Sequence, residues 1–407
     1  MFPNDSTTYR LRCMLENDSE LRQMMLCSLE RAAEHNPDMA TNPVRTLDDL
    51  YKFLDIFITS MPWQAVENFS GTKDTNISLF RRIDQTIGYF YYLFDQPLEE
   101  LKDKGYVFPS LQYEPRIAQW ILQYNSMWGL YLSSEKSWND DYLQQVSADP
   151  LFGLQNDWYE SPDNWHSWND FFARRLSSPD VRPIADSCLV APCDGEQMPW
   201  LPIDGDGNIQ ADTGSGIPIK TTTAFNISPL VPSEYCEFFK GGMMTHVVLD
   251  MYNYHHVHSP ADGTLTQIMH YIEYAAHSGG HIVWDATQHR YRYEQTGVLD
   301  FQPQVPRKTY IIKTAENGYV ALVAVSVAQV GTFEQAENIF VGSHVQKGTY
   351  LGHFLCGSDV LILISKDYIA SKASKTSKIS KTSKFPTPIL MGQALLSSPN
   401  FTQNLDD

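Results

Sequence analysis

The 407-residue sequence contains no apolar run of the roughly 20 residues that a membrane-spanning helix requires. The longest candidate, residues 319–330, is short, rich in β-branched side chains and bounded by glycines, so we expect a strand there. The first residues include acids and form no apolar segment, so they match neither a secretory signal nor a transit peptide. The location expected from these observations is the cytoplasm.

Cysteine is scarce, and its positions form no pattern. The six cysteines, which include no C-x-x-C pair, are Cys13, Cys27, Cys188, Cys193, Cys236 and Cys356. Without a secretory signal, the simplest expectation is that all of them are reduced thiols. The sequence therefore does not predict a disulfide scaffold.

Basic residues are few relative to acidic ones. The chain has 30 Lys and Arg residues against 48 Asp and Glu residues, a formal net charge of -18. This balance argues against nucleic acid as a partner, because phosphate binding requires a basic surface. It also disfavours, without excluding, contact with an anionic membrane. With 43% hydrophobic residues, the chain has ample material for a large core and more than one domain.

Residues 1–150 have the pattern of a helical domain. Thr46 is positioned to cap a helix whose apolar stripe begins at Leu47, and a second stripe with helical period begins at Ile117. Stripes of this kind ordinarily pack a core rather than bind a ligand. A polar linker with scattered aromatic residues, 151–167, ends the domain.

From residue 168 onward the chain consists of short β-rich runs separated by Gly, Pro, Asn and Asp. The clearest runs are 245–251, 309–313, 320–327, 350–355 and 360–364. Dense short strands favour an antiparallel, barrel-like or sandwich-like domain. The expected fold class is therefore α+β, with a helical N-terminal domain followed by a β-rich domain over 168–407.

Two segments of this second half lack a clear pattern. Residues 274–304 are expected to form a long surface excursion, to which we assign no role. Between 366 and 384 lysine recurs, mostly with serine, which predicts a solvated linker. Contact of these lysines with anionic lipid is the alternative.

Three short motifs stand out in the β-rich half, in the order APCDG, YHHVHSPADG and KGTYLGHFLCGS. The first contains Asp194, the second contains His255 and His258, and the third ends with Gly357 and Ser358. A lone Gly-Ser pair is ordinarily a turn. Here it separates two apolar runs, which we expect to be buried strands joined by a tight turn.

Together these motifs resemble the phosphatidylserine decarboxylase family. The family has a Tyr-His-x-x-His-x-Pro-x-x-Gly segment and, later, an x-Gly-x-Phe segment leading to Gly-Ser. The segments FFARRL and RPI, which precede APCDG, add to the likeness, which extends from about residue 168 to about residue 393. Residues 127–137 are similar to the helical N-terminal extension of fungal members, among them soluble L-tryptophan decarboxylases.

The resemblance implies a proenzyme that cleaves itself between Gly357 and Ser358 and converts Ser358 into a pyruvoyl cofactor. The two chains that result are expected to stay associated. Asp194 and His258 would serve this cleavage, and His255 would serve the later decarboxylation. The pyruvoyl carbonyl would take the substrate amine as a Schiff base and accept electrons when carbon dioxide leaves, a task performed elsewhere by pyridoxal phosphate.

The residue types fit this chemistry but leave alternatives open. A serine hydroxyl becomes a nucleophile when an imidazole accepts its proton, and a carboxylate can orient that imidazole. The order Asp194, His258, Ser358 also occurs in one class of serine proteases, but no G-x-S-x-G elbow surrounds Ser358. A hydrolytic or non-catalytic relative is therefore the weaker alternative. The HHVH cluster lacks the cysteine or carboxylate pattern of a metal site, so we expect no metal.

We expect the substrate to be a free amino acid, with tryptophan or another aromatic amino acid as the first choice. The reasons are the acidic chain, the lack of an anchor and the likeness of the N-terminal half to soluble decarboxylases. Phosphatidylserine, decarboxylated to phosphatidylethanolamine in phospholipid biosynthesis, is the alternative. The Pro-x-Asp-Gly sequence around Asp194 favours this alternative, because the fungal tryptophan enzymes tend to depart from it.

Overall fold

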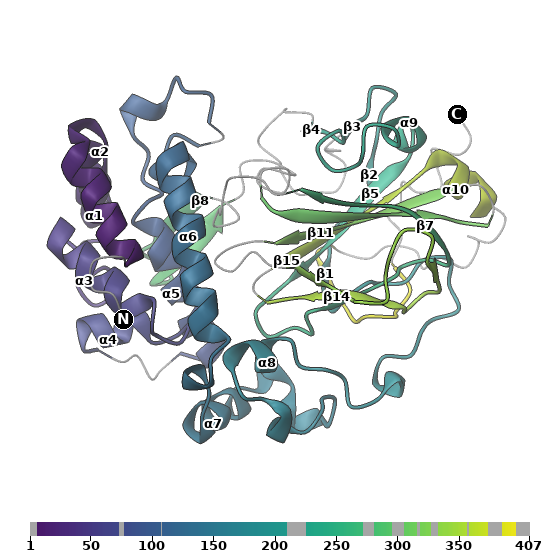
Figure 1. Cartoon of the computed structure of the whole chain (residues 1–407), viewed down its shortest axis with the longest axis horizontal. Coiled ribbons are helices and arrows are strands. Elements are labelled where there is room, and N and C mark those ends of the chain that lie inside the picture. Colours follow the sequence, from purple (N-terminus) through teal and green to yellow (C-terminus); the bar gives the residue numbers. More distant parts are fainter. Residues whose placement is uncertain are drawn as a thin grey trace.

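The computed structural model describes residues 6–72, 77–106, 108–209, 225–271, 281–294, 305–315, 318–326, 333–355, 358–372 and 385–395. Two lobes lie side by side, a helical one built from the N-terminal part of the chain and a β-rich one built mostly from the rest (Figure 1). The strands of the described sheets pair in antiparallel fashion. The α+β prediction is confirmed.

The helical lobe follows the apolar stripes of the sequence. The stripe that begins at Leu47 forms a helix capped by Thr46, whose hydroxyl accepts the backbone N–H of Asp49 while the Asp49 carboxylate accepts the N–H of Thr46. The stripe that begins at Ile117 forms the longest described helix of the lobe. The helices of this part of the chain are α1 (Thr7–Asn17), α2 (Ser19–His35), α3 (Leu47–Phe57), α4 (Ala65–Ser70), α5 (Leu79–Tyr92), α6 (Pro115–Leu132), α7 (Asp140–Ala148) and α8 (Trp168–Phe172).

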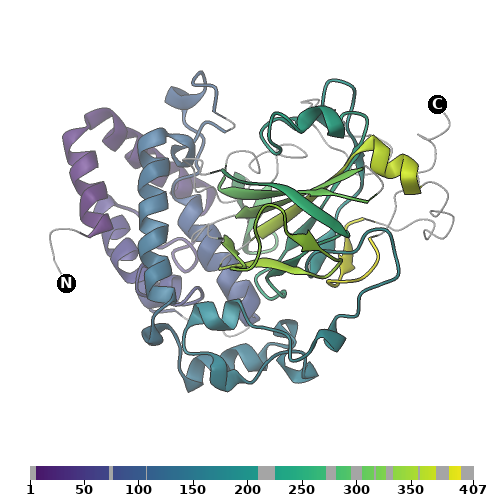
Figure 2. The ribbon, with the colours of Figure 1, turned by 45° about the vertical axis from the view of Figure 1, so that its right-hand side comes forward.

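The segment predicted to be a linker is compact. It runs through the 3₁₀ turns Pro150–Phe152, Leu154–Asn156 and Pro162–Asn164 before α8 begins. Together with α7 and α8 it passes beneath both lobes (Figure 2). The segment therefore runs along both lobes rather than only connecting them. The domain limits expected from the sequence, 1–150, 151–167 and 168–407, stay predictions.

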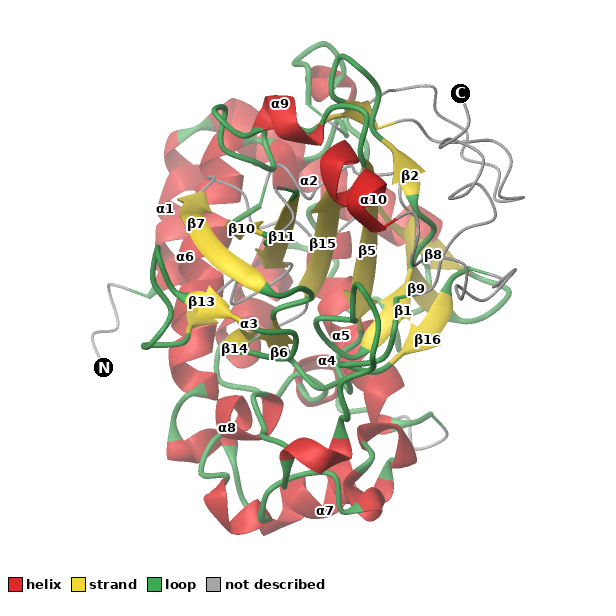
Figure 3. Cartoon of the chain, turned by 90° about the vertical axis from the view of Figure 1, so that its right-hand side faces the viewer, coloured by secondary structure: helices red, strands yellow, loops and turns green. Residues whose placement is uncertain are grey.

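The β-rich lobe is a sandwich of two sheets rather than a closed barrel. Within the described residues, a nine-stranded sheet has the order β13-β7-β10-β11-β15-β5-β1-β16, with β2 paired to β5, and a second sheet has the order β12-β14-β6. The larger sheet faces the viewer in Figure 3, with the helical lobe behind it. Its strands are β1 (Gly195–Gln197), β2 (Leu201–Pro202), β5 (Met243–Leu249), β7 (Gly263–Tyr271), β10 (Arg307–Lys313), β11 (Tyr319–Ser326), β13 (His344–Val345), β15 (Ser358–Ile364) and β16 (Thr387–Ile389).

The smaller sheet packs on one face of the larger one. It consists of β6 (His256–His258), β12 (Phe333–Gln335) and β14 (Tyr350–Phe354). Val360, Ile362 and Ile364 of β15 join the apolar cluster between the two sheets, whereas Leu361 and Leu363 join a cluster on the opposite face. That opposite face is covered by α9 (Cys236–Phe239) and the two-stranded ladder of β3 (Asn208–Ile209) and β4 (Phe225–Asn226). Because both faces of β15 are covered, its residues 360–364 form a continuous apolar run.

The strands on either side of the Gly357-Ser358 pair belong to different sheets. β14 pairs with β6 and β12, whereas β15 pairs with β11 and β5. The two buried strands expected from the sequence are therefore present, but they do not form a hairpin with each other. The chain instead crosses from one layer of the sandwich to the other, and residues 356–357 at this crossing lie outside the described residues.

Part of the segment without a predicted role forms a hairpin that packs into the helical lobe. β8 (His281–Asp285) pairs with β9 (Arg290–Glu294), and Ile282 and Tyr291 belong to the apolar core of the helices. The backbone N–H of Tyr291 donates to Oε1 of Gln85 on α5 over 2.7 Å. The expectation of a surface excursion is thus wrong for residues 281–294, while 274–280 and 295–304 lie outside the described residues.

The lysine-rich segment begins as a helix. Residues Lys366–Lys372 form α10, in which Tyr368 and Ile369 are buried against the sandwich. Residues 373–384 lie outside the described part of the chain. Across the described helices, none combines the length and apolar character that crossing a membrane requires.

Candidate functional site

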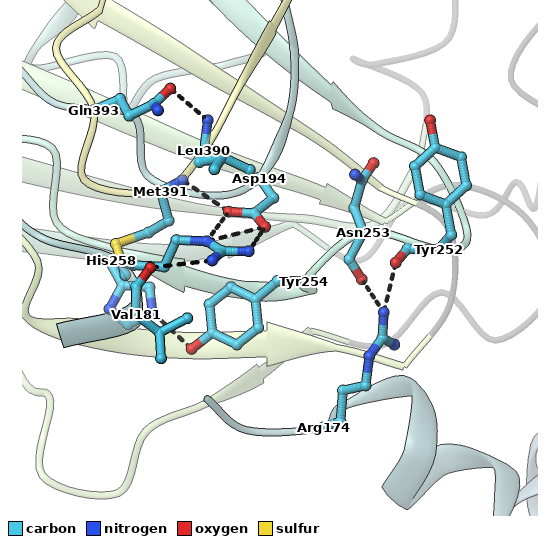
Figure 4. Close-up of polar contacts among 11 residues, drawn as sticks. Arg174, Val181, Asp194, Tyr252, Asn253, Tyr254, His258, Leu390, Met391 and Gln393 are labelled. Carbon is cyan, nitrogen blue, oxygen red and sulfur yellow. Dashed lines mark hydrogen bonds and ion pairs between the residues drawn. The ribbon is translucent and has the colours of Figure 1, made fainter. Parts of the chain in front are cut away.

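The YHHVH segment lies in and just before β6, the strand at one edge of the smaller sheet. All three of its histidines are buried, as is Tyr254. The segment is held from the helical side by Arg174, whose guanidinium is buried and donates to the backbone carbonyls of Tyr252 and Asn253 (Figure 4). A fully buried arginine thus fixes the backbone directly before the histidines.

His258 has a defined tautomer. Its Nδ1 lies 2.8 Å from the carbonyl oxygen of Gly348, which can only accept, so Nδ1 carries the proton. The other nitrogen, Nε2, is then an acceptor and lies 3.1 Å from the hydroxyl of Tyr254. Burial lowers the pKa of His258, and the carbonyl of Gly348 and the charge of Asp194 oppose that lowering. The ring is therefore a neutral base with Nε2 as its basic atom.

Asp194 is paired with Arg182 and not with His258, the partner that the sequence suggested. Its carboxylate is paired with Arg182, Nη2 to Oδ2 over 2.7 Å and Nε to Oδ1 over 3.1 Å, and both side chains are buried. The backbone N–H of Met391 adds a third hydrogen bond over 2.8 Å. Within the described contacts, no hydrogen bond joins Asp194 to His258, although the two residues lie in the same group (Figure 4). The negative charge of Asp194 therefore affects His258 electrostatically and without a hydrogen bond. The Gly348 carbonyl orients the ring.

His255 has unsatisfied hydrogen-bonding capacity. The ring is fully buried and stacks on Phe172 with centroids 3.9 Å apart. Within the described residues, neither ring nitrogen has a hydrogen-bond partner. Burial, followed by the charge of Arg174, lowers the pKa of His255 well below its ordinary value, and the Asn253 carbonyl, which forms no hydrogen bond of normal geometry with the ring, offsets this only in part. A neutral imidazole without partners is rare in a core and marks a place for a further polar group.

Ser358 is the first residue of β15. Its backbone pairs with Ser326 of β11 on one side and with Leu249 of β5 on the other. Its side chain and residue Gly357 lie outside what the structure describes. The structure thus places Asp194 near His258, whereas the ring of His255 packs on Phe172. The roles predicted for these residues and for Ser358 stay predictions.

Sequence reasoning assigned no role to three residues that organise the site. Arg182 binds Asp194, Arg174 holds the backbone before β6, and Tyr254 donates to His258. Both arginines lie in the segments FFARRL and RPI that accompany the motifs. Their burial was the missing information, because a sequence does not show which of several arginines is enclosed.

The described residues include no cluster of three or more His, Cys, Asp or Glu side chains suited to hold a metal ion. His256 instead donates through Nε2 to the carbonyl oxygen of Ala173 over 2.8 Å. Because a carbonyl only accepts, Nε2 carries the proton. Burial lowers the pKa of His256 to about 3, so this ring is also neutral.

Comparison with known proteins gives a family match over the β-rich lobe. The family profile described as phosphatidylserine decarboxylase matches residues 168–397. The match begins at the first residue of α8, so α1 to α7 lie outside it.

Curated relatives show the same similarity. A protein of Saccharophagus degradans is 39% identical over 116 residues, which are 28% of this chain and 37% of the relative. One of Alteromonas mediterranea is 27% identical over 239 residues, 56% of this chain and 69% of the relative. One of Polaromonas is 24% identical over 243 residues, 58% of this chain and 82% of the relative. Each of the three is named phosphatidylserine decarboxylase proenzyme.

Proposed function

The chain belongs to the phosphatidylserine decarboxylase family, a family of pyruvoyl-dependent carboxy-lyases, and on that premise we propose that it is a self-cleaving decarboxylase of phosphatidylserine. The bond cut is the one between Gly357 and Ser358. The observation that carries the proposal is the buried imidazole of His258, whose Nε2 is a base because the Gly348 carbonyl holds the proton on Nδ1.

Cleavage begins with proton transfer. Once the Tyr254 hydroxyl has moved away from Nε2, His258 accepts the proton of the Ser358 hydroxyl, and the oxygen attacks the carbonyl carbon of Gly357. His258 passes that proton to the departing nitrogen, the amide C–N bond breaks, and an ester links Gly357 to the serine oxygen. The fixed charge of Asp194 stabilises the imidazolium that forms at His258.

Elimination completes the cut. Loss of the serine α-proton breaks the ester Cβ–O bond, which leaves a carboxylate on Gly357 and a dehydroalanine at position 358. One water then replaces the nitrogen, ammonia leaves, and a pyruvoyl group caps the small chain. The atoms balance with one water consumed and one ammonia released per cleavage.

The residues present fit such a group. His255 is buried against Phe172 with both ring nitrogens unsatisfied among the described residues, and a carbonyl-bearing group beside it would supply a partner. Once formed, the pyruvoyl group supplies a carbonyl that condenses with the substrate amine and accepts the electron pair released as carbon dioxide departs. His255 would take up a proton and return it to the substrate carbon.

Phosphatidylserine replaces the free amino acid that the charge of the chain favoured. The relatives named above support the lipid and none of them supports an aromatic amino acid. The Pro-x-Asp-Gly sequence around Asp194 favours the same choice. The product expected from phosphatidylserine is phosphatidylethanolamine.

The test is mass spectrometry of the purified protein together with an assay of carbon dioxide release. The native chain is expected as two fragments split before position 358, and Ser358→Ala as one intact inactive chain, whereas the control Ser371→Ala, on α10, should cleave normally. An intact native chain would contradict the cleavage. Carbon dioxide from free tryptophan or serine, and none from phosphatidylserine vesicles, would contradict the lipid substrate.

A further inference from the structure

A polar cavity lies between the helical side of the molecule and the smaller sheet. Its volume is about 580 Å³, within the range of small-molecule sites. Asn169, Asp170 and Arg175 line it from the segment around α8, and Glu334, Tyr350 and His353 line it from β12 and β14. The cavity is therefore built jointly by both parts of the chain.

The cavity lies near the proposed reaction site. Leu355 lies in its wall, and Ser358 follows three residues later. Three Cα–Cα steps span at most about 11 Å, so the first residue of β15 lies within that distance of the wall. His256, the neighbour of His255, also lines the cavity. A head group held here would therefore lie near the start of β15.

The carboxylates of the wall already have donors. Glu160 accepts the backbone N–H of Arg175 over 3.0 Å and the indole N–H of Trp165 over 3.3 Å. Asp170 accepts the N–H of His166 over 3.0 Å. Glu334 lies 3.4 Å from Nε2 of His353, whose Nδ1 accepts the hydroxyl of Tyr350 over 2.7 Å. These acids are occupied by the protein itself.

Arg175 is different, because this residue is exposed and its charge has no partner within the described contacts. Its backbone is bonded to Glu160, but within the described contacts its guanidinium makes no hydrogen bond or ion pair. Its charge nevertheless contributes to lowering the pKa of His353, after burial and against the opposing charge of Glu334, so it acts on the cavity wall. A guanidinium presents donors in a fork that matches two oxygens of a phosphate.

We propose that Arg175 binds the phosphodiester of the phosphatidylserine head group in this cavity, so that α8 and the segment around it form part of the substrate pocket. The inference rests on the proposed function. The phosphodiester is a better partner than the substrate carboxylate for a physical reason. The carboxylate loses its charge as carbon dioxide leaves, so a cation there stabilises the ground state more than the transition state, whereas a phosphodiester keeps its charge throughout.

The first experiment measures binding without catalysis. Glycerophospho-L-serine, the head group without acyl chains, is titrated calorimetrically into the uncleaved Ser358→Ala chain. Adding Arg175→Gln is expected to raise the dissociation constant at least about tenfold, since a charged hydrogen-bonding partner is lost. Arg175→Lys should recover part of the affinity, and the control Arg22→Gln, on α2, should change nothing. Equal constants with Arg175 and with Gln, or no binding by the parent, would overturn the inference.

The second experiment uses the mature enzyme and distinguishes the two sources of the head group. With phosphatidylserine vesicles and with soluble glycerophosphoserine, Arg175→Gln should raise KM and leave cleavage before Ser358 normal. A rise with vesicles alone would place Arg175 at the membrane surface rather than on the phosphodiester, and would overturn the inference. Failure of the native chain to cleave or to release carbon dioxide would instead count against the proposed function.

Discussion

Three histidines within four residues have three different environments. Nε2 of His256 donates to the carbonyl of Ala173, Nδ1 of His258 donates to the carbonyl of Gly348, and His255 has no hydrogen-bond partner among the described residues. Burial is the leading cause that lowers the pKa of each ring. At neutral pH all three are therefore uncharged, which keeps them able to accept a proton when a hydroxyl or a carbon acid requires it.

At this scale, His255 and His258 should separate two steps. We expect His255→Ala to form two chains normally, because cleavage needs the base at His258, but to lower kcat by about 10²- to 10⁴-fold, the range for loss of a proton-transfer group. The measurement is the two-chain fraction followed by carbon dioxide release from phosphatidylserine vesicles. His270→Ala, at an exposed position of β7, is the control. Normal turnover would remove His255 from the site, and absent cleavage would show that the two roles are not separable.

The site residues that belong to short sequence motifs were predictable. Asp194, His255 and His258 were identified from their motifs, and the structure places Asp194 near His258. The ion pair of Asp194 with Arg182 was not predictable, because the choice of partner depends on how β1 and the preceding loop fold together. The same holds for the Gly348 carbonyl, which lies 90 residues from His258 in the sequence and orients its ring.

At the scale of elements, the β8–β9 hairpin fastens the β-rich half of the sequence to the helices. Its Ile282 N–H donates to Asp95 over 2.7 Å, and the Asp95 carboxylate also accepts the hydroxyl of Ser110. The hydroxyl of Tyr291 donates to the carbonyl of Thr41 over 2.8 Å. These bonds are largely buried, so each is costly to leave unmade.

Removing the Tyr291 hydroxyl tests this attachment. Tyr291→Phe keeps the ring but leaves the Thr41 carbonyl and one N–H of Asn36 without that partner, so we expect a loss of about 1–3 kcal/mol in the free energy of unfolding. Urea unfolding of the uncleaved Ser358→Ala chain measures it, with Tyr9→Phe, at an exposed position of α1, as the control. An unchanged midpoint would mean that the hairpin contributes little to holding the two parts together.

Elements with internal periodicity were predictable, and this hairpin was not. α3, α6 and the strands β5, β10, β11 and β15 follow patterns that bury one face or both, and the sequence shows those patterns. In β8 and β9 the apolar positions match the surface of α5, so their spacing reflects a distant partner. The sequence of this hairpin therefore lacks the regular spacing of apolar residues from which a helix or strand can be predicted.

At the scale of the whole molecule, an acid of the helical lobe lies close enough to an acid of the β-rich lobe to be affected by its charge. Asp84 lies on α5 and Asp250 directly follows β5. Burial raises the pKa of Asp84 to about 6; the charge of Asp250 also raises it, while Arg81, Arg290 and a hydrogen bond from Gln85 oppose the rise. Burial raises the pKa of Asp250 as well. Both carboxyl groups therefore become protonated at a higher pH than ordinary aspartates do.

Asp84→Asn should change the pH dependence of stability. The folded-state pKa lies above that of an unfolded aspartate, so the native chain gains stability from protonated Asp84 at low pH and loses it as pH rises through about 6. The variant should thus be more stable than its parent by roughly 1–3 kcal/mol at pH 8, with the difference shrinking towards pH 4. Urea unfolding at several pH values measures this, with exposed Asp103→Asn as the control. A difference independent of pH would contradict the assignment.

The central place of β15 has a consequence for reversibility. Under the proposed cleavage, the small fragment begins with a strand that is hydrogen-bonded on both sides, to β11 and to β5, and it also carries β16, which pairs with β1. Neither fragment can then dissociate without breaking the hydrogen bonds of the sheet, so cleavage alone should not release either fragment. Once the mature protein is denatured, however, two separate molecules must meet again to rebuild one sheet. Refolding should therefore depend on protein concentration, whereas the uncut Ser358→Ala chain should refold by a unimolecular reaction. Because the proposed self-cleavage requires the folded site, a cleaved bond would show that the chain had once folded correctly.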